Sequence, residues 1–278
     1  MPLADPAPVP RAAAAFLAVV AALAPTAGCG TGDGSSAAPR VVPPRAGASF
    51  DYQIGGGYPP PDGVRVVSRD RTDRPAPGVY SVCYVNAFQA QPGELSRWRA
   101  RDPGLLLRDG DGALVVDDEW DEALLDTSTA AKREALAEVV GAWIENCAER
   151  GFRAVEPDNL DSFERSEGLL TPADNAAFAR LLASRAHAAG LAVAQKNTTE
   201  LLPQRSGIGF DFAVAEECGE FDECGSYAAA YDDRVLVVAY DAADFTATCR
   251  NWGPRLAVVL RDRDVAPAGE PGHVFRTC

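Results

Sequence analysis

The sequence predicts an α/β fold in which eight parallel strands and their connecting helices close into a single (β/α)8, TIM-like barrel. Short runs rich in β-branched and aromatic residues recur eight times along the chain. Segments of helical character separate many of these runs, an alternation typical of a parallel sheet. Residues 49–278 form one domain's length of chain, at the small end of the range for such barrels, which begins at about 200 residues.

Each predicted strand is a short apolar run, and most of these runs end at a polar residue. The predicted strands are residues 50–55, 64–68, 79–86, 153–158, 191–197, 210–216, 235–241 and 256–262. The predicted helices are residues 92–100, 130–150, 172–189, 226–231 and 242–251. We expect an incomplete helix layer after the first strand, because residues 55–62 are rich in Gly and Pro and too few for a crossover helix.

An insertion is expected between the third and fourth strands. Residues 105–108 and 113–116 are apolar runs that flank Asp109-Gly110-Asp111-Gly112, which predicts a hairpin with a glycine-containing turn. The two aspartates resemble the start of a calcium loop. Ala113 stands where the next ligand is required, so we reject a calcium site.

The first 28 residues have the pattern of a signal peptide, with Arg11 followed by an apolar run over residues 12–24. This run is too short for a membrane-spanning helix, which needs roughly 20 apolar residues. Small residues precede Cys29 as in a lipoprotein signal, although Thr26 stands where an aliphatic residue is usual. We therefore expect export, as a lipoprotein anchored at Cys29 or as a secreted protein, with residues 29–48 as a Gly/Ser/Pro-rich tether.

The composition is acidic, with 40 Asp and Glu against 26 Lys and Arg and a formal net charge of -14. This charge disfavours nucleic acid as a partner and favours a cationic or neutral one. We expect a monomer that contacts a membrane only through the lipid anchor.

Six cysteines follow Cys29, an even number that in an exported chain predicts up to three disulfides. Cys218–Cys224 is the first expected pair and Cys249–Cys278 the second. A thiolate metal site is the alternative, but no Cys-x-x-Cys or nearby histidine completes a ligand set.

Histidine is almost absent, and this excludes several classes of enzyme. The chain has two histidines, His187 and His273, and neither has an evident partner for a catalytic triad. It has no Gly-x-Ser-x-Gly turn, phosphate-binding loop or His-Glu-x-x-His sequence. We expect neither a cofactor nor a metal.

Carboxylates and amides instead follow the predicted strands. In a parallel barrel the carboxyl ends of the strands meet on one face, where catalytic groups lie. Two carboxylates without histidine are the equipment for hydrolysis of a glycosidic bond. The strand-end residues are Asp70, Asn86, Asp158, Asn159, Asp161, Lys196, Asn197, Glu216, Glu217, Tyr240, Asp241 and Asp262.

Among these residues we assign Asp158 as the nucleophile and Glu216 as the acid/base. Repulsion within the acidic cluster around Glu216 would favour protonation of a buried member. Strand alternation does not decide between Glu216 and Glu217, because both faces of residues 210–215 are largely apolar. Lys196 fits two roles, contact with substrate or neutralisation of a buried aspartate.

Four motifs together resemble glycoside hydrolase family 114, the endo-α-1,4-polygalactosaminidase-like barrels. They are Gly151-Phe-Arg-Ala-Val-Glu-Pro-Asp-Asn-Leu-Asp161, Ala186-His187 before Gly190-Leu191, Gln195-Lys196-Asn197, and Asp211-Phe-Ala-Val-Ala-Glu-Glu-Cys218 with Glu223-Cys224. The resemblance implies hydrolysis of α-1,4-linked galactosamine-containing polysaccharide. For the two-carboxylate mechanism we expect retention, with inversion as the alternative. The alternative is a noncatalytic carbohydrate-binding lipoprotein with the same barrel.

The resemblance also implies positions for the site. The acidic pair of the family corresponds to Asp158 and Glu216, and its cleft to Asp51, Tyr84, Asp126, Lys196, Asn197 and Tyr240. Asn86, Asn159, Asp161 and Glu217 are further candidates for contact with substrate. Residues 86–89 depart from the small-residue loop usual after the third strand, so the subsites are expected to differ. Tyr52, Tyr58, Tyr84, Trp98 and Trp120 are aromatic residues available either for sugar stacking or for packing.

Overall fold

The computed structural model describes residues 40–91 and 93–278. The predicted signal peptide, Cys29 and most of the predicted tether lie outside the described residues. The end of the tether contacts the barrel, because Val41 and Ala48 pack against its inner apolar cluster. The hydroxyl of Tyr80 also donates a hydrogen bond to the carbonyl of Val42 at 2.8 Å. The last residues of the predicted tether thus pack against the barrel.

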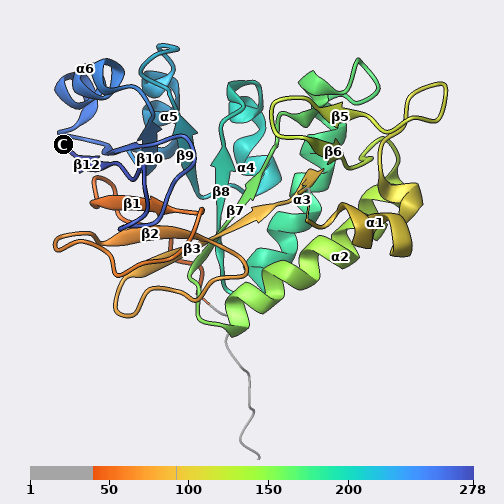
Figure 1. The fold of residues 1–278 in the computed structure, drawn as a ribbon, viewed down its shortest axis with the longest axis horizontal. Coiled ribbons are helices and arrows are strands. Elements are labelled where there is room, and N and C mark those ends of the chain that lie inside the picture. Colours follow the sequence, from red (N-terminus) through yellow and green to blue (C-terminus); the bar gives the residue numbers. More distant parts are fainter. Residues whose placement is uncertain (1–39, 92) are drawn as a thin grey trace, which may run out of the picture. The chain divides into compact units, whose positions relative to one another are not determined.

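A nine-stranded sheet forms a nearly closed barrel, which confirms the predicted fold class (Figure 1). All eight predicted strands are present, and adjacent ones pair in parallel. They are β1 (Phe50–Gln53), β2 (Val66–Asp70), β3 (Tyr80–Asn86), β7 (Ala154–Asp158), β8 (Ala192–Lys196), β9 (Phe212–Glu216), β10 (Val235–Ala239) and β11 (Ala257–Arg261). β12 (Phe275–Thr277), which we did not predict, pairs antiparallel with β11. β1 lies beside β11, and Arg261 contacts Asp51 at 3.4 Å across this closure.

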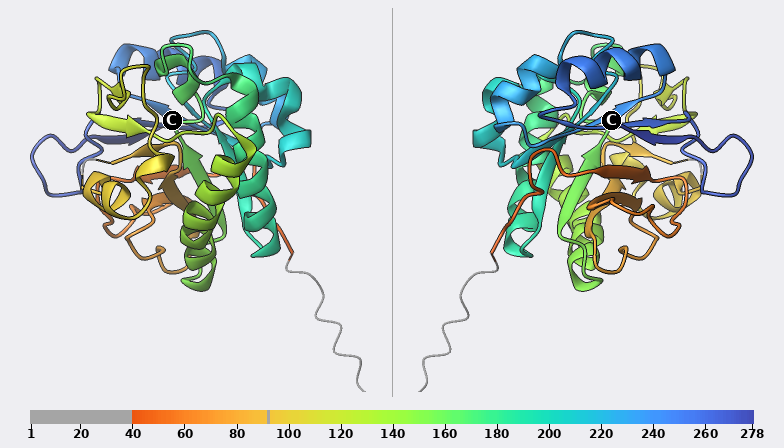
Figure 2. Two further views of the ribbon diagram at one scale, coloured as in Figure 1. Left: turned by 90° about the vertical axis from the view of Figure 1, so that its right-hand side faces the viewer. Right: turned by 90° about the vertical axis from the view of Figure 1, so that its left-hand side faces the viewer.

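Helices cover the barrel unevenly. α2 (Ala130–Glu149) and α3 (Pro172–Ala188) lie side by side outside the sheet (Figure 2). The remaining helices are α1 (Leu95–Arg101), α4 (Arg205–Ile208), α5 (Cys224–Tyr231) and α6 (Ala242–Trp252), with short 3-10 helices at Pro103–Leu105, Ser162–Arg165 and Thr199–Gln204. Residues 54–65 and 71–79, all described, contain no helix. The helix layer is therefore missing after the second strand as well as after the first.

The start of α3 is specified locally. The side chain of Thr171 accepts a hydrogen bond from the backbone N–H of Asp174, and the Asp174 carboxylate accepts one from the backbone N–H of Thr171. Pro172 occupies the first turn, where the missing N–H removes no helical hydrogen bond. This reciprocal capping fixes the helix that packs behind β7 and β8.

The insertion after β3 contains a small sheet that we did not predict, beside the segments predicted as a hairpin. Its regular part is a three-stranded sheet in the order β4 (Gln89–Ala90), β6 (Glu122–Leu124), β5 (Val116–Asp117). The segments predicted as a hairpin pair antiparallel through a bridge between Arg108 and Leu114 and through a hydrogen bond from the N–H of Val115 to the carbonyl of Leu107 at 3.1 Å. The Asp109 carboxylate accepts hydrogen bonds from the N–H groups of Asp111 and Ala113, both at 2.9 Å, and so shapes the turn.

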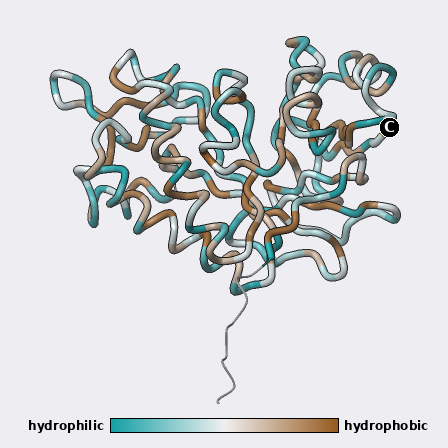
Figure 3. The backbone as a smooth tube through the Cα atoms, turned by 180° about the vertical axis from the view of Figure 1, so that it is seen from behind, coloured by the Kyte–Doolittle hydropathy of each residue, from teal (hydrophilic) through white to brown (hydrophobic). Residues whose placement is uncertain are grey.

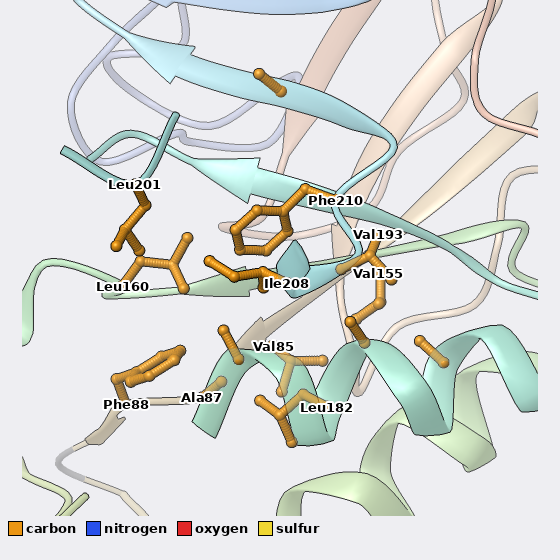
Figure 4. Close-up of a cluster of buried hydrophobic side chains, with 14 of the residues drawn as sticks. Val85, Ala87, Phe88, Val155, Leu160, Leu182, Val193, Leu201, Ile208 and Phe210 are labelled. Atoms are coloured by element: carbon orange, nitrogen blue, oxygen red, sulfur yellow. The ribbon is translucent and has the colours of Figure 1, made fainter. Parts of the chain in front are cut away.

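Apolar residues form two main layers. One fills the barrel interior and includes Phe50, Val66, Val82, Phe212 and Leu236. The other lies between the sheet and the helices, where Val85, Val155 and Val193 of three strands face Leu182 of α3 (Figure 4). The backbone coloured by hydropathy shows the hydrophobic stretches gathered inside and hydrophilic ones in the outer loops (Figure 3). Successive residues of each strand thus serve opposite faces.

Three disulfides join the six cysteines after Cys29: Cys83–Cys147, Cys218–Cys224 and Cys249–Cys278. Two of them are pairs expected from the sequence. Such bonds persist in oxidising compartments, in agreement with export. None of the helices in the described part of the chain has the length and apolar character needed to span a membrane.

Candidate active site

Strand alternation carries polar side chains into the carboxyl end of the barrel. Phe212 and Val214 belong to the inner apolar cluster, so Glu216, two residues further on, faces inward. Glu217 leaves the strand with a φ of 53°, and its carboxylate pairs with Arg263 at 2.9 Å. The structure thereby distinguishes the two glutamates that the sequence left equivalent. The same alternation brings together Tyr52, Ser68, Glu156, Asp158 and Lys196.

Lys196 is the centre of this cluster. Its side chain is 2% exposed, and its Nζ lies 3.0 Å from Asp158, 3.2 Å from Glu216 and 3.4 Å from Glu156. It also donates a hydrogen bond to the hydroxyl of Tyr52 at 3.1 Å. Burial alone would lower the pKa of Lys196, but the surrounding carboxylates outweigh this effect and raise it well above its ordinary value. Lys196 is therefore a permanent positive charge among three carboxylates.

The Asp158 carboxylate is held in its ionised form. Burial would raise the pKa of Asp158, but the charge of Lys196 and hydrogen bonds from the Asn159 backbone and the Tyr84 side chain lower it below its ordinary value. A permanently ionised carboxylate inside the cavity has the properties of a nucleophile.

Glu156 lies beneath Lys196 and is fully buried. Its carboxylate accepts hydrogen bonds from Tyr52 at 2.8 Å and from Ser68 at 2.6 Å. Burial raises the pKa of Glu156 to about 7, against the opposing charge of Lys196. Glu156 therefore shares Lys196 with Asp158 while remaining closed to solvent.

The Glu216 carboxylate is oriented from two sides. Asn197 donates a hydrogen bond to it at 3.0 Å and accepts one from the Glu216 backbone N–H at 2.8 Å. The hydroxyl of Tyr240 donates a further short hydrogen bond to the other carboxylate oxygen. Asn197 has a left-handed backbone, with φ of 44°, at the turn where β8 ends. This turn places its side chain between two neighbouring strands.

Asp158, Lys196, Asn197, Glu216 and Tyr240 all line one cavity of about 730 Å³. Its lining includes 12 Asp and Glu residues but only three cations, Arg165, Lys196 and Arg263. The acidic residues are Asp70, Asp117, Glu119, Glu122, Asp158, Asp161, Glu164, Glu200, Glu216, Glu217, Glu223 and Asp264. Within residues 40–91 and 93–278, no group of three or more His, Cys, Asp or Glu is arranged to hold a metal ion.

Comparisons with known proteins identify the family. Residues 32–278 match glycoside-hydrolase family GH114. The chain belongs to this family. The crystal structure of Ega3 from Aspergillus fumigatus in complex with galactosamine superposes with a TM-score of 0.68 at 21% identity, covering 86% of this chain and 98% of Ega3. The glycoside hydrolase domain of PelA from Pseudomonas aeruginosa gives 0.53 at 14% identity, covering 80% and 96%. No curated protein sequence matches significantly.

Nine of the twelve site residues expected from the sequence line the cavity of this GH114 domain. They are Tyr84, Asp158, Asn159, Asp161, Lys196, Asn197, Glu216, Glu217 and Tyr240. The other three are Asp51, Asn86 and Asp126, which are absent from the lining and engaged in buried contacts.

Each of these three residues has a structural partner. Asp51 is fully buried and accepts hydrogen bonds from Gln53 and Tyr58 beside Arg261, because on β1 it is Tyr52 that faces the barrel interior. Asp126, just before α2, accepts hydrogen bonds from Ser128 and pairs with Lys132 in the first turn of that helix. Asn86 donates to Glu122 at 2.6 Å and accepts from Asn159 at 3.0 Å, so it supports the cavity wall.

Sequence reasoning missed two kinds of residue. Glu156 precedes Asp158 by two residues on one strand, and this spacing alone places both on the same face. Glu122 and Asp117 come from the insertion, whose strands are too short for their alternation of apolar and polar residues to be recognised. Burial raises the pKa of Glu122 to about 7, opposed by its hydrogen bond from Asn86.

Proposed function

We propose that this GH114 protein is an exported hydrolase of α-1,4-linked galactosamine-containing polysaccharide. Asp158 acts as nucleophile and Glu216 as acid/base of a retaining mechanism. The observation that carries the proposal is the shared contact of both carboxylates with the buried Lys196, within an acidic cavity. The proposed export has two forms, a lipid anchor at Cys29 or release as a secreted protein.

The separation of the two carboxylates supports retention. One oxygen of Asp158 and one of Glu216 lie 3.0 and 3.2 Å from the same nitrogen atom, so they cannot be farther apart than the sum of these distances, 6.2 Å. Retaining pairs stand about 5–5.5 Å apart and inverting pairs about 6.5–9.5 Å, because inversion requires room for a water molecule. This upper limit applies to the two oxygens nearest Lys196 and agrees with the close spacing of a retaining pair.

The surroundings suit the two roles. Lys196 and Tyr84 stabilise the Asp158 carboxylate that attacks the anomeric carbon to form a glycosyl ester. Glu216 donates its proton to the leaving oxygen and then accepts one from the water that hydrolyses the ester. Asn197 and Tyr240 fix the direction of the Glu216 carboxylate during both steps.

The charge of the cavity supports a cationic substrate. Deacetylated galactosamine units carry ammonium groups, and 12 carboxylates against three cations attract such a polymer. The fold shared with Ega3, whose structure contains galactosamine, agrees with this choice.

The test measures reducing ends released from galactosamine-containing polysaccharide at several degrees of deacetylation. We expect release to increase with deacetylation in the wild type. Saturable binding of every polymer with no release would instead support a noncatalytic carbohydrate-binding protein.

Variants of the two carboxylates test the mechanism. Asp158→Asn and Glu216→Gln should each reduce turnover about 10³-fold or more. Azide should restore turnover of the Glu216 variant on a substrate with a good leaving group, because only its second step then lacks a catalyst. Glu217→Gln, at the neighbouring residue, is the matched control and should retain most of the activity. Near-normal rates for both Asp158 and Glu216 variants would rule out the assignment.

A further inference from the structure

Two exposed aromatic side chains line the cavity outside the carboxylate cluster. Among the described residues, five large hydrophobic side chains are exposed: Val42, Trp120, Leu169, Phe221 and Val274. Trp120 and Phe221, the only aromatic ones, are 52% and 62% exposed, and both line the cavity. Their position in the cavity lining, together with this exposure, leaves an aromatic face free to stack on a sugar ring.

Trp120 is presented by an anchored turn. It lies in the turn between β5 and β6 of the insertion. Asp117, the last residue of β5, is buried at 4% exposed. The Asp117 carboxylate accepts hydrogen bonds from Gln89 at 3.0 Å and from the backbone of Glu119 at 3.0 Å, and it pairs with Arg165 at 2.7 Å. These contacts fix the base of the turn to the barrel, so little conformational entropy is lost when a ligand meets Trp120.

Phe221 is presented by a closed ring. The disulfide Cys218–Cys224 spans it, and the N–H of Phe221 donates to the carbonyl of Glu217 at 3.2 Å. The N–H of Glu223 donates to the carbonyl of Cys218 at 2.8 Å inside the same ring. The disulfide was expected from the sequence, but the exposed ring residue that it supports was not.

The two aromatic residues flank the carboxylate pair. The insertion follows β3 and the disulfide ring follows β9, while β7 and β8, which carry Asp158 and Lys196, lie between these strands in the sheet (Figure 1). Carboxylates adjoin each aromatic residue in the cavity lining, Glu119 beside Trp120 and Glu223 near Phe221. An aromatic face with a nearby carboxylate matches the apolar face and the ammonium group of an amino sugar.

We propose that Trp120 and Phe221 are two sugar-binding platforms that hold amino-sugar units on opposite sides of the bond to be cut. This inference rests on the proposed function and extends it, because it requires a substrate long enough to reach both platforms. Short substrates engage only the carboxylate pair and gain nothing from either aromatic residue.

Trp120→Ala and Phe221→Ala test the platforms, with Leu169→Ala as the control. Leu169 is also a large exposed hydrophobic residue, at 42%, but it does not line the cavity. We expect each platform variant to raise KM for the polymer about 10-fold, the scale of one lost aromatic contact. Hydrolysis of an aryl α-galactosaminide should stay at the wild-type rate, and Leu169→Ala should match wild type on both substrates.

A binding measurement separates failure of the platforms from failure of the proposed function. Calorimetry of deacetylated galactosamine oligosaccharides with Asp158→Asn should give affinities about 10-fold weaker when Trp120→Ala or Phe221→Ala is added. If the wild type cuts the polymer but both platform variants keep its KM, the platforms are wrong and the function stands. If the wild type is inactive, unchanged oligosaccharide affinity in the variants overturns the platforms, and weakened affinity supports them. Absence of any binding overturns both.

Discussion

The barrel interior contains two regions of opposite chemistry on the same strands. Toward the amino ends the inward side chains are apolar, as at Phe50, Val82 and Phe212. Two to four residues further along, the inward side chains are Tyr52, Tyr84 and Glu216, with Lys196 among them. Because alternation preserves the face, one strand geometry serves both regions. The apolar region stabilises the barrel, while the polar region uses that rigidity to hold charges close together.

Replacing the central cation should have the largest effect on the polar region. Lys196→Met leaves three carboxylates without their counter-charge, so the free energy of unfolding should fall by about 3–5 kcal/mol and turnover should be lost. Lys132→Met is the matched control, because the other lysine is 36% exposed and its partner Asp126 keeps its hydrogen bonds from Ser128. Urea unfolding should show a change of at most about 1 kcal/mol for it. Equal effects of the two variants would contradict the comparison.

In the apolar region a large truncation should affect stability alone. Phe212→Ala removes a fully buried ring from the barrel interior and should cost about 3–5 kcal/mol of unfolding free energy. The rate per folded molecule should stay close to wild type at low temperature, because Glu216 keeps its hydrogen bonds to Asn197 and Tyr240. A specific loss of kcat in fully folded protein would show that the two regions are not separable.

The protonation of the buried Glu156 should make the stability of the barrel depend on pH. Its pKa in the folded state is about 7 against an ordinary 4.5, so between these values the folded protein binds more protons than the unfolded chain. Stability should therefore fall as the pH rises from about 4.5 to about 7. Glu156→Gln should flatten this dependence in unfolding measured across that window. Part of the slope should remain, because burial also raises the pKa of Glu122 to about 7. An unchanged slope would remove Glu156 as its source.

The smallest effect is expected outside both regions. Thr171→Ala removes the cap of α3 and should cost about 1 kcal/mol in thermal unfolding, with unchanged kcat and KM. Ser128→Ala is the comparison variant, because it removes a hydroxyl that donates to Asp126 just before α2 and leaves the cap of α3 intact. Loss of activity in the Thr171 variant would mean that α3 transmits its position to the site.

The strands were predictable because their apolar runs are long and end at polar residues. β12 gave no such signal, since its three residues are partly or fully exposed and are held by pairing with β11. The strands of the insertion are two or three residues long, below the length at which periodicity is visible. The Asp-Gly turn at residues 109–112 was detectable, but it forms outside the three-stranded sheet.

The site was predictable where chemistry follows a strand end and unpredictable where it depends on side-chain partners. Asp158, Lys196 and Glu216 end their strands. Asp51, a candidate only through the family resemblance, lies within β1 and occupies the opposite face from Tyr52. One signal was present but unused: the chain contains only two lysines, and one is fully enclosed. Its compact ammonium contacts all three carboxylates from one nitrogen atom.

The disulfide ring around Phe221 has a practical consequence for producing the protein. In a reducing cytoplasm the cysteines of all three disulfides would stay thiols, and of these pairs Cys218–Cys224 is the one that closes the ring around Phe221, whereas the carboxylate cluster is carried by the strands. Such a preparation would pass an assay with a small chromogenic sugar and still perform poorly on the polymer. The ratio of the two activities would then report how completely a given expression host has oxidised the enzyme.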